Sequence, residues 1–294
     1  MTSHRSVLLN EVIQWLDPSP GRLVADGTLG RAGHAMEILR RTSPDGRLIG
    51  FDKDPEAVEE GRKILREFGE RVMIFHEDFR NIPSRLESIG QKADGILLDL
   101  GVSSPQLDEP RRGFSFNAEG PLDMRMNPEE NLTAREVINT YPKQALMELF
   151  WKYGEERFSR RIAEKITEVR RTRRINTTKD LESIIWQAVP AAYRHGRIHP
   201  ATRVFQALRI EVNQEIDALE LFLSKPLEAL NPDGRLVIIS FHSLEDRVVK
   251  NAFRQFLKDG KGKILTKKPV VATSVEVREN PRSRSAKLRV FQKS

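Results

Sequence analysis

Short apolar runs alternate with amphipathic stretches along roughly the first hundred residues of the chain. The runs contain few polar side chains and cover residues 23–25, 47–52, 72–76 and 93–100. Such runs are typical of strands that are buried on both faces of a parallel sheet. The stretches between them carry apolar residues at helical spacing. This alternation predicts an α/β fold with an open, mostly parallel sheet.

The pattern changes after Leu100. Residues 108–126 show no steady period, and helical spacing then extends from Thr133 to about Val189. Thr133 is followed three residues later by Glu136, a pair that predicts a capping box at a helix start.

These changes predict two domains. We expect residues 105–202 to form an all-helical domain inserted after the fourth strand, and residues 1–104 and 203–294 to form the sheet domain.

The chain then returns to the sheet. We expect one helix over residues 204–230 and a fifth strand over residues 234–240. Two weaker strands, near residues 263–266 and 288–292, are expected to pair as an antiparallel hairpin at the sheet edge. The basic segment 279–285 between them is expected to be a mobile loop.

A glycine-rich turn follows the first strand. Gly27, Gly30 and Gly33 let the backbone turn tightly and approach a ligand closely. Asp52 ends the next strand, where an acid suits a ribose hydroxyl pair. The turn therefore predicts a nucleoside-bearing cofactor, although the glycines could serve turn geometry alone. Their G-x-x-G-x-x-G spacing differs from the dinucleotide fingerprint and argues mildly against NAD.

Polar side chains also follow the other strands. Candidate groups stand at five strand ends, which meet at one edge of a parallel sheet: Asp26, Asp52, Asp78 with Phe79, Asp99 to Ser104, and Ser240 to Ser243. The turn has no P-loop lysine, and an acid-rich rim suits a cationic cofactor better than a triphosphate.

Composition narrows the class of protein. The 294 residues carry a formal net charge of +7 and include no cysteine, which excludes disulfides and thiolate metal sites. No apolar run is long enough to span a bilayer, and the first ten residues lack a signal-peptide core, so we expect a cytoplasmic protein. The positive charge suits a polyanionic partner such as RNA, or it serves solubility alone. His195 and His199 flank Gly196 and precede Pro200, so we expect no metal site.

The motifs carry a more specific resemblance. The sequence resembles the class I S-adenosylmethionine-dependent methyltransferases and, more closely, the bacterial 16S rRNA cytosine-N4 methyltransferase family, known as RsmH or MraW. The matching segments span nearly the whole chain: residues 4–9, 26–34, 52–55, 98–108, 112–116, 199–203 and 240–247. Residues 99–108 and 240–247 are the most specific of them.

The resemblance implies a Rossmann-like sheet, S-adenosyl-L-methionine as cofactor, and methylation of the exocyclic N4 of a cytidine in the decoding region of 16S rRNA. It assigns cofactor binding to residues 1–104 and 203–294, and substrate recognition to the helical insertion. It places Ala32, Gly33 and His34 near the methionine part, Asp52 on the ribose and Phe79 by the adenine, with Asp99 and Gln106 nearby. Asp26, Gly27 and Gly30 complete the expected cofactor set.

The exocyclic nitrogen that accepts the methyl group is a poor nucleophile, because its lone pair is conjugated with the cytosine ring. The chain lacks the Asp/Asn/Ser-Pro-Pro-aromatic loop of many amino-methyltransferases. We hypothesise that Asp99, with Ser103 or Ser104, accepts hydrogen bonds from the amine. His242 is a candidate to take the proton after transfer. The alternative for His242 is a structural histidine bonded to its own loop.

Arginines are concentrated in the insertion. The candidate RNA contacts are Arg160, Arg161, Arg170, Arg171, Arg173, Arg174, Arg197 and Arg203. Such a run also fits a solvated helix face, since Glu164 and Glu168 partly neutralise it. Phe114, Phe116 and Tyr193 are candidate stacking partners for a base, or core aromatics.

Three other functions stay open at this stage. An NAD-dependent oxidoreductase would use Asp52, a non-catalytic RNA-binding protein would keep only the basic surface, and another methyltransferase would act on DNA or protein. We expect 16S rRNA or the small ribosomal subunit as partner and no membrane association. The sequence leaves a homodimer open.

Overall fold

The computed structural model describes residues 6–294, so the first two residues of the matching segment 4–9 lie outside the described part. The chain divides into two compact units. The first combines Met1–Gly101 with Ile216–Ser294, and the second is Val102–Glu215.

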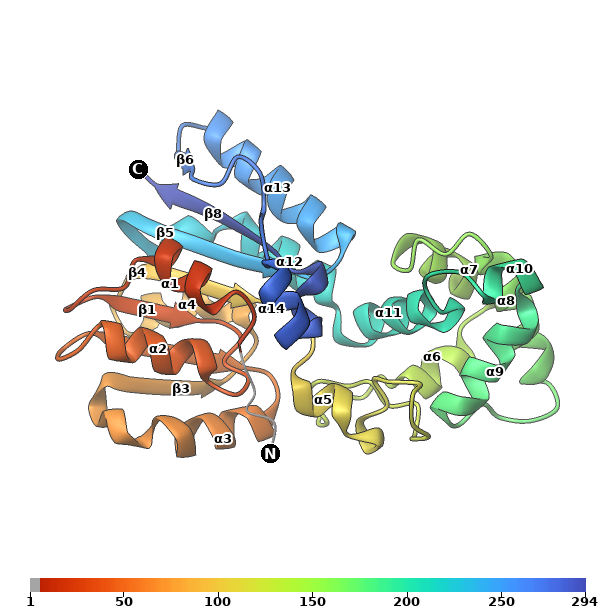
Figure 1. Ribbon diagram of the computed structural model, residues 1–294. Helices are drawn as coiled ribbons and strands as arrows, with labels where there is room; N and C mark the ends of the chain where they lie inside the picture. Colours follow the sequence, from red (N-terminus) through yellow and green to blue (C-terminus); the bar gives the residue numbers. More distant parts are fainter. Residues whose placement is uncertain (1–5) are drawn as a thin grey trace. The chain divides into compact units, whose positions relative to one another are not determined.

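An eight-stranded sheet forms the centre of the first unit (Figure 1). Its strands lie in the order β3-β2-β1-β4-β5-β8-β6, and β7 pairs with β8 off this path. The five strands from β1 to β5 are parallel, whereas β8 is antiparallel to each of its neighbours. The strands are β1 (Leu23–Asp26), β2 (Arg47–Asp52), β3 (Val72–His76), β4 (Ala93–Asp99), β5 (Leu230–Ser240), β6 (Gly262–Ile264), β7 (Val270–Val271) and β8 (Lys287–Lys293).

This topology confirms the predicted mostly parallel α/β sheet with an antiparallel edge. Strand β6 pairs with β8 as expected for the edge hairpin, and β8 lies between β5 and β6. Strand β5 begins at Leu230 rather than at the predicted residue 234, because Leu230 already pairs with Ala93 before a register shift.

Helices cover both faces of the sheet. Residues of α4 (Ile82–Ser88), α12 (Glu215–Ser224) and α13 (Ser243–Lys258) pack with Ala25, Ile49 and Ile96 in one apolar cluster. Residues of α1 (Leu9–Leu16) and α2 (Gly33–Arg41) pack with Val24, Leu48 and Leu97 in the other. Side chains alternate along each strand, so both faces are buried and the strands read as continuous apolar runs. Helices α3 (Pro55–Ile64) and α14 (Ser274–Glu279) complete the α-helices described in this unit.

Several segments of the first unit are 3₁₀-helical. They are η1 (Leu65–Arg71), η2 (Phe79–Asn81), η4 (Pro226–Ala229) and η5 (Pro281–Ser285). Segment 279–285, expected as a mobile loop, instead contains η5, where Ser283 is fully buried and its hydroxyl donates to the Asn280 carbonyl. None of the helices within residues 6–294 combines the length and the apolar character needed to cross a bilayer.

The second unit is helical. Its helices are α5 (Ser104–Asp108), η3 (Pro110–Arg112), α6 (Ala134–Thr140), α7 (Lys143–Lys152), α8 (Ser159–Val169), α9 (Thr178–Ala188), α10 (Ala191–Arg194) and α11 (Pro200–Asn213). The capping box predicted at Thr133 is confirmed: its hydroxyl accepts from the Glu136 amide (3.2 Å), and Glu136 Oε2 accepts from the Thr133 amide (2.9 Å).

Two predicted boundaries differ from the structure. The insertion was expected to end at Thr202, but this residue lies inside α11, which packs on helices of the second unit, and the division follows Glu215. The single helix expected over residues 204–230 is interrupted, because Gln214 adopts a left-handed conformation with φ 52° and caps α11. Apolar periodicity continues through this break, so the sequence pattern hides it.

Candidate functional site

The glycine-rich turn follows β1 and is hydrogen-bonded to β2 and β4. The Gly27 amide donates to the Leu97 carbonyl (2.9 Å) and the Leu29 amide to the Phe51 carbonyl (2.9 Å). The Thr28 hydroxyl accepts from the Asp99 amide (2.6 Å). These bonds fix the turn at the carboxyl edge of β1, β2 and β4. This is the edge at which open α/β sheets bind ligands, where the strand order reverses between β1 and β4.

Two glycines are required here by close packing. A Cβ on Gly27 would overlap side-chain atoms of Leu98, Ile82 and Phe79, and a Cβ on Gly33 would overlap the Ser6 hydroxyl. The turn therefore lies directly against β4 on one side and against the N-terminal segment on the other. Ala32 precedes α2 in a left-handed conformation with φ 55°.

Three carboxyl groups end neighbouring strands at this edge. Asp26 ends β1, Asp52 ends β2 and Asp99 ends β4. Asp52 Oδ2 accepts from the Gly30 amide (2.8 Å), and its Oδ1 accepts from the Asp54 amide (2.9 Å). Asp26 Oδ1 accepts from the Thr28 amide (3.1 Å). The predicted acids of the first unit are therefore brought to one edge of the sheet.

These carboxyl groups resist ionisation. Burial raises the pKa of Asp26 to about 7, with the charge of Asp52 adding to the effect. Burial raises the pKa of Asp52 to about 6, although the backbone amides of Asp54 and Gly30 oppose the shift. Burial, together with the charges of Asp26 and Glu245, holds the pKa of Asp99 well above its usual range.

Asp99 has an unsatisfied acceptor. Its Oδ1 is buried and has no hydrogen-bond partner among residues 6–294. A buried acceptor without a partner costs about 1–3 kcal/mol, so the site is completed by a ligand donor or by a proton. A cation would also favour the ionised form of all three carboxyls. The arrangement thus fits a positively charged nucleoside cofactor such as S-adenosylmethionine.

Phe79 is shared between the site edge and the core. It begins η2, which Asp78 caps by accepting from the Arg80 amide (2.9 Å). Its ring contacts Phe222 edge-on with centroids 5.9 Å apart, and it packs partly buried against the first apolar cluster. Its predicted position by an adenine stays a prediction.

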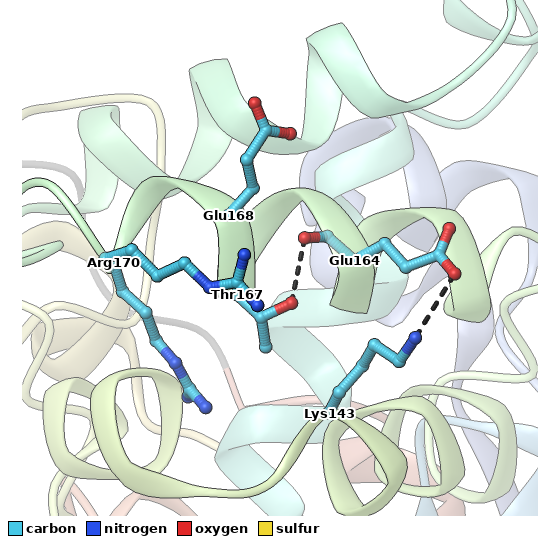
Figure 2. Close-up of a pocket in the computed structure, with 6 residues that line it drawn as sticks. Lys143, Glu164, Thr167, Glu168 and Arg170 are labelled. Atoms are coloured by element: carbon cyan, nitrogen blue, oxygen red, sulfur yellow. Dashed lines mark hydrogen bonds and ion pairs between the residues drawn. The ribbon is translucent and has the colours of Figure 1, made fainter.

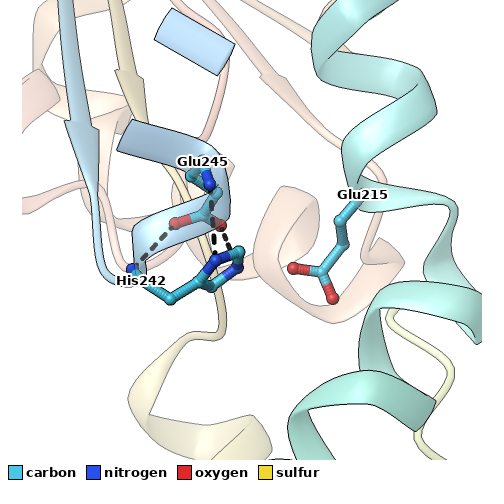
Figure 3. A group of neighbouring side chains, drawn as sticks. All are labelled: Glu215, His242 and Glu245. Atoms are coloured by element: carbon cyan, nitrogen blue, oxygen red, sulfur yellow. Dashed lines mark hydrogen bonds and ion pairs between the residues drawn. The ribbon is translucent and has the colours of Figure 1, made fainter. Parts of the chain in front are cut away.

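His242 is engaged within its own helix start. Its Nδ1 accepts from the Glu245 amide (3.4 Å), and its Nε2 lies 3.1 Å from Glu245 Oε1 (Figure 3). Glu245 Oε2 accepts in turn from the Phe241 amide (2.8 Å). This capping box at α13 favours the structural alternative for His242. Its proposed role as proton acceptor stays a prediction.

Ser103, Ser104 and Gln106 belong to the second unit, whereas Asp99 belongs to the first. Ser103 caps α5 in a capping box, and Gln106 Oε1 accepts from its amide (2.9 Å). Gln106 is buried. The grouping of these residues with Asp99 around one ligand stays a prediction.

The predicted RNA contacts differ in whether their side chains already bind other protein groups. Arg170 donates to the Ile138 carbonyl (2.8 Å), Arg173 pairs with Asp180 (2.8 Å) and Arg203 donates to the Tyr193 hydroxyl (3.1 Å). Arg173 is exposed despite this ion pair, as are five others: Arg160, Arg161, Arg171, Arg174 and Arg197.

Some of these residues line a groove that contains both basic and acidic side chains (Figure 2). It is lined by Lys143, Glu164, Thr167, Glu168, Arg170 and Arg171. Glu164 pairs with Lys143 (3.3 Å) and with Arg160 (3.4 Å). Acids therefore offset some of the basic side chains. Among the described residues, four of the predicted contacts are exposed and make no ion pair: Arg161, Arg171, Arg174 and Arg197.

The candidate stacking aromatics pack against protein groups. Phe114 is buried, and the Arg112 guanidinium lies 6.0 Å from its ring centroid. Phe116 stacks on the His199 ring (4.8 Å), and Tyr193 donates to Glu156 (2.7 Å). Within the described chain, these contacts explain the three rings as parts of the helical unit.

One contact of the site was not predicted from the sequence. The ring of His34 lies between the Val7 carbonyl and the Asp99 carboxylate. Both segments, 4–9 and 26–34, belong to the resemblance, which is the sequence signal that they share a site. That signal does not show which atoms of the two segments are in contact.

Comparison with known proteins places the chain in a family. The profile of the MraW methylase family matches residues 1–294. "Ribosomal RNA small subunit methyltransferase H" of Heliobacterium mobile is 48% identical over 99% of this chain and 98% of its own length. The protein of the same name from Syntrophotalea carbinolica is 46% identical, again over 99% and 98%.

Solved structures resemble the chain more distantly. A putative rRNA methylase from Clostridium thermocellum covers 99% of this chain and 100% of its own at 13% identity and a TM-score of 0.43. The NSun6 structure from Pyrococcus horikoshii covers 99% and 53% at 13% identity and a TM-score of 0.46. The sequence matches, which extend from end to end, decide the assignment: the chain belongs to the MraW methylase family.

Proposed function

We propose that this protein is an S-adenosylmethionine-dependent methyltransferase that methylates the exocyclic N4 of a cytidine in the decoding region of 16S rRNA. The observation that carries the proposal is the whole-length match to the family, whose curated members at 44–48% identity are named for the small-subunit rRNA. Family membership argues against the oxidoreductase and the non-catalytic alternatives. The substrate places the enzyme in the cytoplasm, with 16S rRNA or the small subunit as partner.

The cofactor would be held at the acid-rich edge of the sheet. Its contacts are Asp26, Gly27, Gly30, Ala32, Gly33, His34, Asp52, Phe79, Asp99 and, from the second unit, Gln106. When bound, S-adenosylmethionine supplies a methyl group on a positively charged sulfur. Asp52, already fixed by two backbone amides, has lone pairs left for ribose hydroxyls. The raised pKa values of Asp26 and Asp52 support a cationic ligand.

Asp99 would act on the nucleophile. Its partnerless Oδ1 suits an N–H of the cytosine amine, and Ser103 or Ser104 would accept the second N–H. Hydrogen bonds that draw both hydrogens out of the ring plane take the nitrogen lone pair out of conjugation and favour a nucleophilic, pyramidal nitrogen. Positioning of the reacting groups would supply most of the acceleration, since it can contribute about 7–11 kcal/mol.

The exposed arginines of the second unit would hold the RNA backbone. Arg160, Arg161, Arg171, Arg174 and Arg197 present their guanidinium groups to solvent. Arg170, Arg173 and Arg203 would act from within the hydrogen bonds that fix them. The target base must be unstacked before its amine can be reached.

Methyl transfer from labelled cofactor tests the proposal. The protein is incubated with labelled S-adenosylmethionine and either free 16S rRNA or 30S particles, and the modified nucleoside is identified by mass spectrometry. We expect N4-methylcytidine in the decoding region. Label at another atom, or in no nucleoside of either substrate, contradicts the proposal.

Asp99→Ala tests the role assigned to the carboxylate. We expect at least about 100-fold slower transfer, in the range lost with a general base, at saturating cofactor. Wild-type turnover by this variant with cofactor bound would eliminate the role.

A further inference from the structure

The His34 ring is held in a single tautomer. The side chain is 6% exposed, and its Nε2 lies 3.0 Å from the Val7 carbonyl oxygen. Because a carbonyl oxygen can only accept, the hydrogen of the neutral ring belongs on Nε2. The other nitrogen, Nδ1, then turns its lone pair toward Asp99, whose Oδ2 is 3.8 Å away.

The carbonyl that selects this tautomer is itself fixed. The next amide, that of Leu8, donates to Glu276 Oε1 of α14 (2.7 Å). Leu8 has a left-handed backbone with φ 53°, and Ser6 fills the space beside Gly33. Segment 6–8 is thus held against the cofactor turn from two sides, and the Val7 carbonyl keeps its direction.

Asp99 faces other acids and one base. Asp26 of β1 and Glu245 of α13 act on it as negative charges, and both raise its pKa. Among the described residues, the nitrogen base within ion-pair distance of Asp99 is His34 of α2. Within residues 6–294, His34 Nδ1 is therefore the neutral nitrogen base that lies nearest to a proton on Asp99.

We propose, on the basis of the function proposed above, that His34 is a positioning residue that acts through Asp99 as the second acceptor of the proton released by the methylated amine. The amine nitrogen forms the bond to the methyl carbon, and the electron pair of the broken sulfur–carbon bond stays on sulfur. One N–H bond of the amine then breaks, its electron pair stays on nitrogen, and the proton moves to Asp99. His34 Nδ1 takes up that proton, leaving an imidazolium beside a carboxylate.

This assignment differs from the role predicted for His242, whose Nδ1 caps α13 and whose buried Nε2 lies 3.1 Å from Glu245 Oε1 without a hydrogen bond to residues 6–294. Catalytic hydrogen bonds are often long before the ligands bind, so 3.8 Å between Nδ1 and Oδ2 is compatible with a contact that tightens in the complex.

Nitrogen NMR of the cofactor-free protein tests the tautomer without any activity measurement. With ¹⁵N-labelled histidine at pH above 7, we expect the hydrogen of His34 on Nε2 and an unprotonated Nδ1. Asp99→Asn should move the Nδ1 signal of His34. The same change should leave the Nδ1 signal of His76 unchanged. This control histidine has a similar contact, since its Nε2 lies 3.0 Å from the Lys53 carbonyl oxygen. A hydrogen on Nδ1, or an Nδ1 signal indifferent to Asp99→Asn, overturns the proposal.

His34→Gln tests the proton transfer. Glutamine keeps an N–H for the Val7 carbonyl and has no basic atom at the Nδ1 position. We expect the single-turnover rate at saturating cofactor to fall about 10–100-fold, in addition to any loss of cofactor affinity from the assigned cofactor contact of His34. The acid limb of the pH–rate profile should move to lower pH, because Asp99 then titrates alone instead of sharing a proton with a second base. His76→Gln, the matched control, should leave rate and profile unchanged.

The outcomes separate the two proposals. If the wild-type protein forms no N4-methylcytidine, the proposed function fails. If it does and His34→Gln keeps the wild-type plateau and profile, the role of His34 fails while the function stands. If His34→Gln lowers cofactor affinity without changing the saturated rate, His34 is only a cofactor contact. Thermal unfolding checks that each variant is folded. If His34→Gln does not fold, His34→Asn takes its place.

Discussion

At the scale of single residues, the site depends on carboxyl groups kept where ionisation is costly. Asp26 is 1% exposed, and burial raises its pKa from 3.8 to about 7. The hydrogen bond from the Thr28 backbone amide stabilises the ionised form and opposes this shift. Asp52 and Asp99 were predicted from their places at strand ends. Besides burial, the charges of Asp26 and Glu245 raise the pKa of Asp99, and both residues are far from Asp99 in the chain.

Asp26→Asn should stabilise the cofactor-free protein at alkaline pH. Between pH 4 and 7 the folded protein keeps a proton on Asp26 that the unfolded chain has released, so the stability that this group contributes is lost as pH rises through about 7. Above pH 7 the variant avoids the buried charge, and we expect its free energy of unfolding to exceed that of the wild type by on the order of 2–4 kcal/mol.

Denaturant unfolding at pH 5 and pH 8.5 measures the difference. At pH 5 the difference should be smaller, about 1–2 kcal/mol, because folded Asp26 is then neutral and only the ionisation of the unfolded chain lowers the stability of the wild type. The exposed Asp217, on α12, provides the control Asp217→Asn, which should have no effect at either pH. A variant less stable than the wild type at pH 8.5 would contradict the assigned cause.

At the scale of elements, the irregular segment before α6 is held by hydrogen bonds from side chains rather than by helix or strand pairing. Arg112 donates to the Met126 carbonyl (2.9 Å). Asn213, at the end of α11, accepts from the Met126 amide (2.7 Å) and donates to the Met124 carbonyl (2.7 Å). Periodicity could not predict this, because the partners are 87 and 89 residues apart and share no repeat.

Asn213→Ala should loosen this segment selectively. The change leaves a buried amide and a buried carbonyl without partners, at about 1–3 kcal/mol for each group. We expect the Met126 amide to exchange with solvent at least 10-fold faster, as followed by hydrogen-exchange mass spectrometry, with β1 to β5 unaffected. Gln187→Ala, on the exposed side of α9, is the control. Unchanged protection around residue 126 would show that other contacts hold the segment.

At the scale of the whole molecule, the acids of the predicted cofactor site and the arginines of the predicted RNA surface lie in different units. The acid-rich sheet edge lies in the first unit, and the arginine-rich helices form the second. Residues 102–215 are contiguous, whereas the first unit is assembled from both ends of the chain. Opposite requirements explain the division: a cationic cofactor needs acids, and a polyanionic partner needs bases.

Arg171→Ala with Arg174→Ala should weaken RNA binding in a salt-dependent way. Each lost phosphate contact reduces the slope of log affinity against log salt by about 0.7–0.9. We therefore expect the double variant to lose about 1.5 from that slope and to bind more weakly at low salt, as measured by filter binding of 16S rRNA. Arg66→Ala, an exposed arginine of η1 in the first unit, should not alter the slope. An unchanged slope in the double variant would remove these arginines from the RNA contact.

The sequence by itself determined the order of strands and helices, the glycine turn, the carboxylates at the strand ends and the family. All of these are local signals, carried by apolar period, turn residues or contiguous motifs. Only the tertiary structure decided that His34 bridges Val7 and Asp99, that His242 caps its own helix, that Gln214 interrupts a predicted helix, and that Arg170 and Arg203 already have partners. The physical reason is that a hydrogen-bond partner is chosen by distance in space, and periodicity along the chain carries no record of that distance.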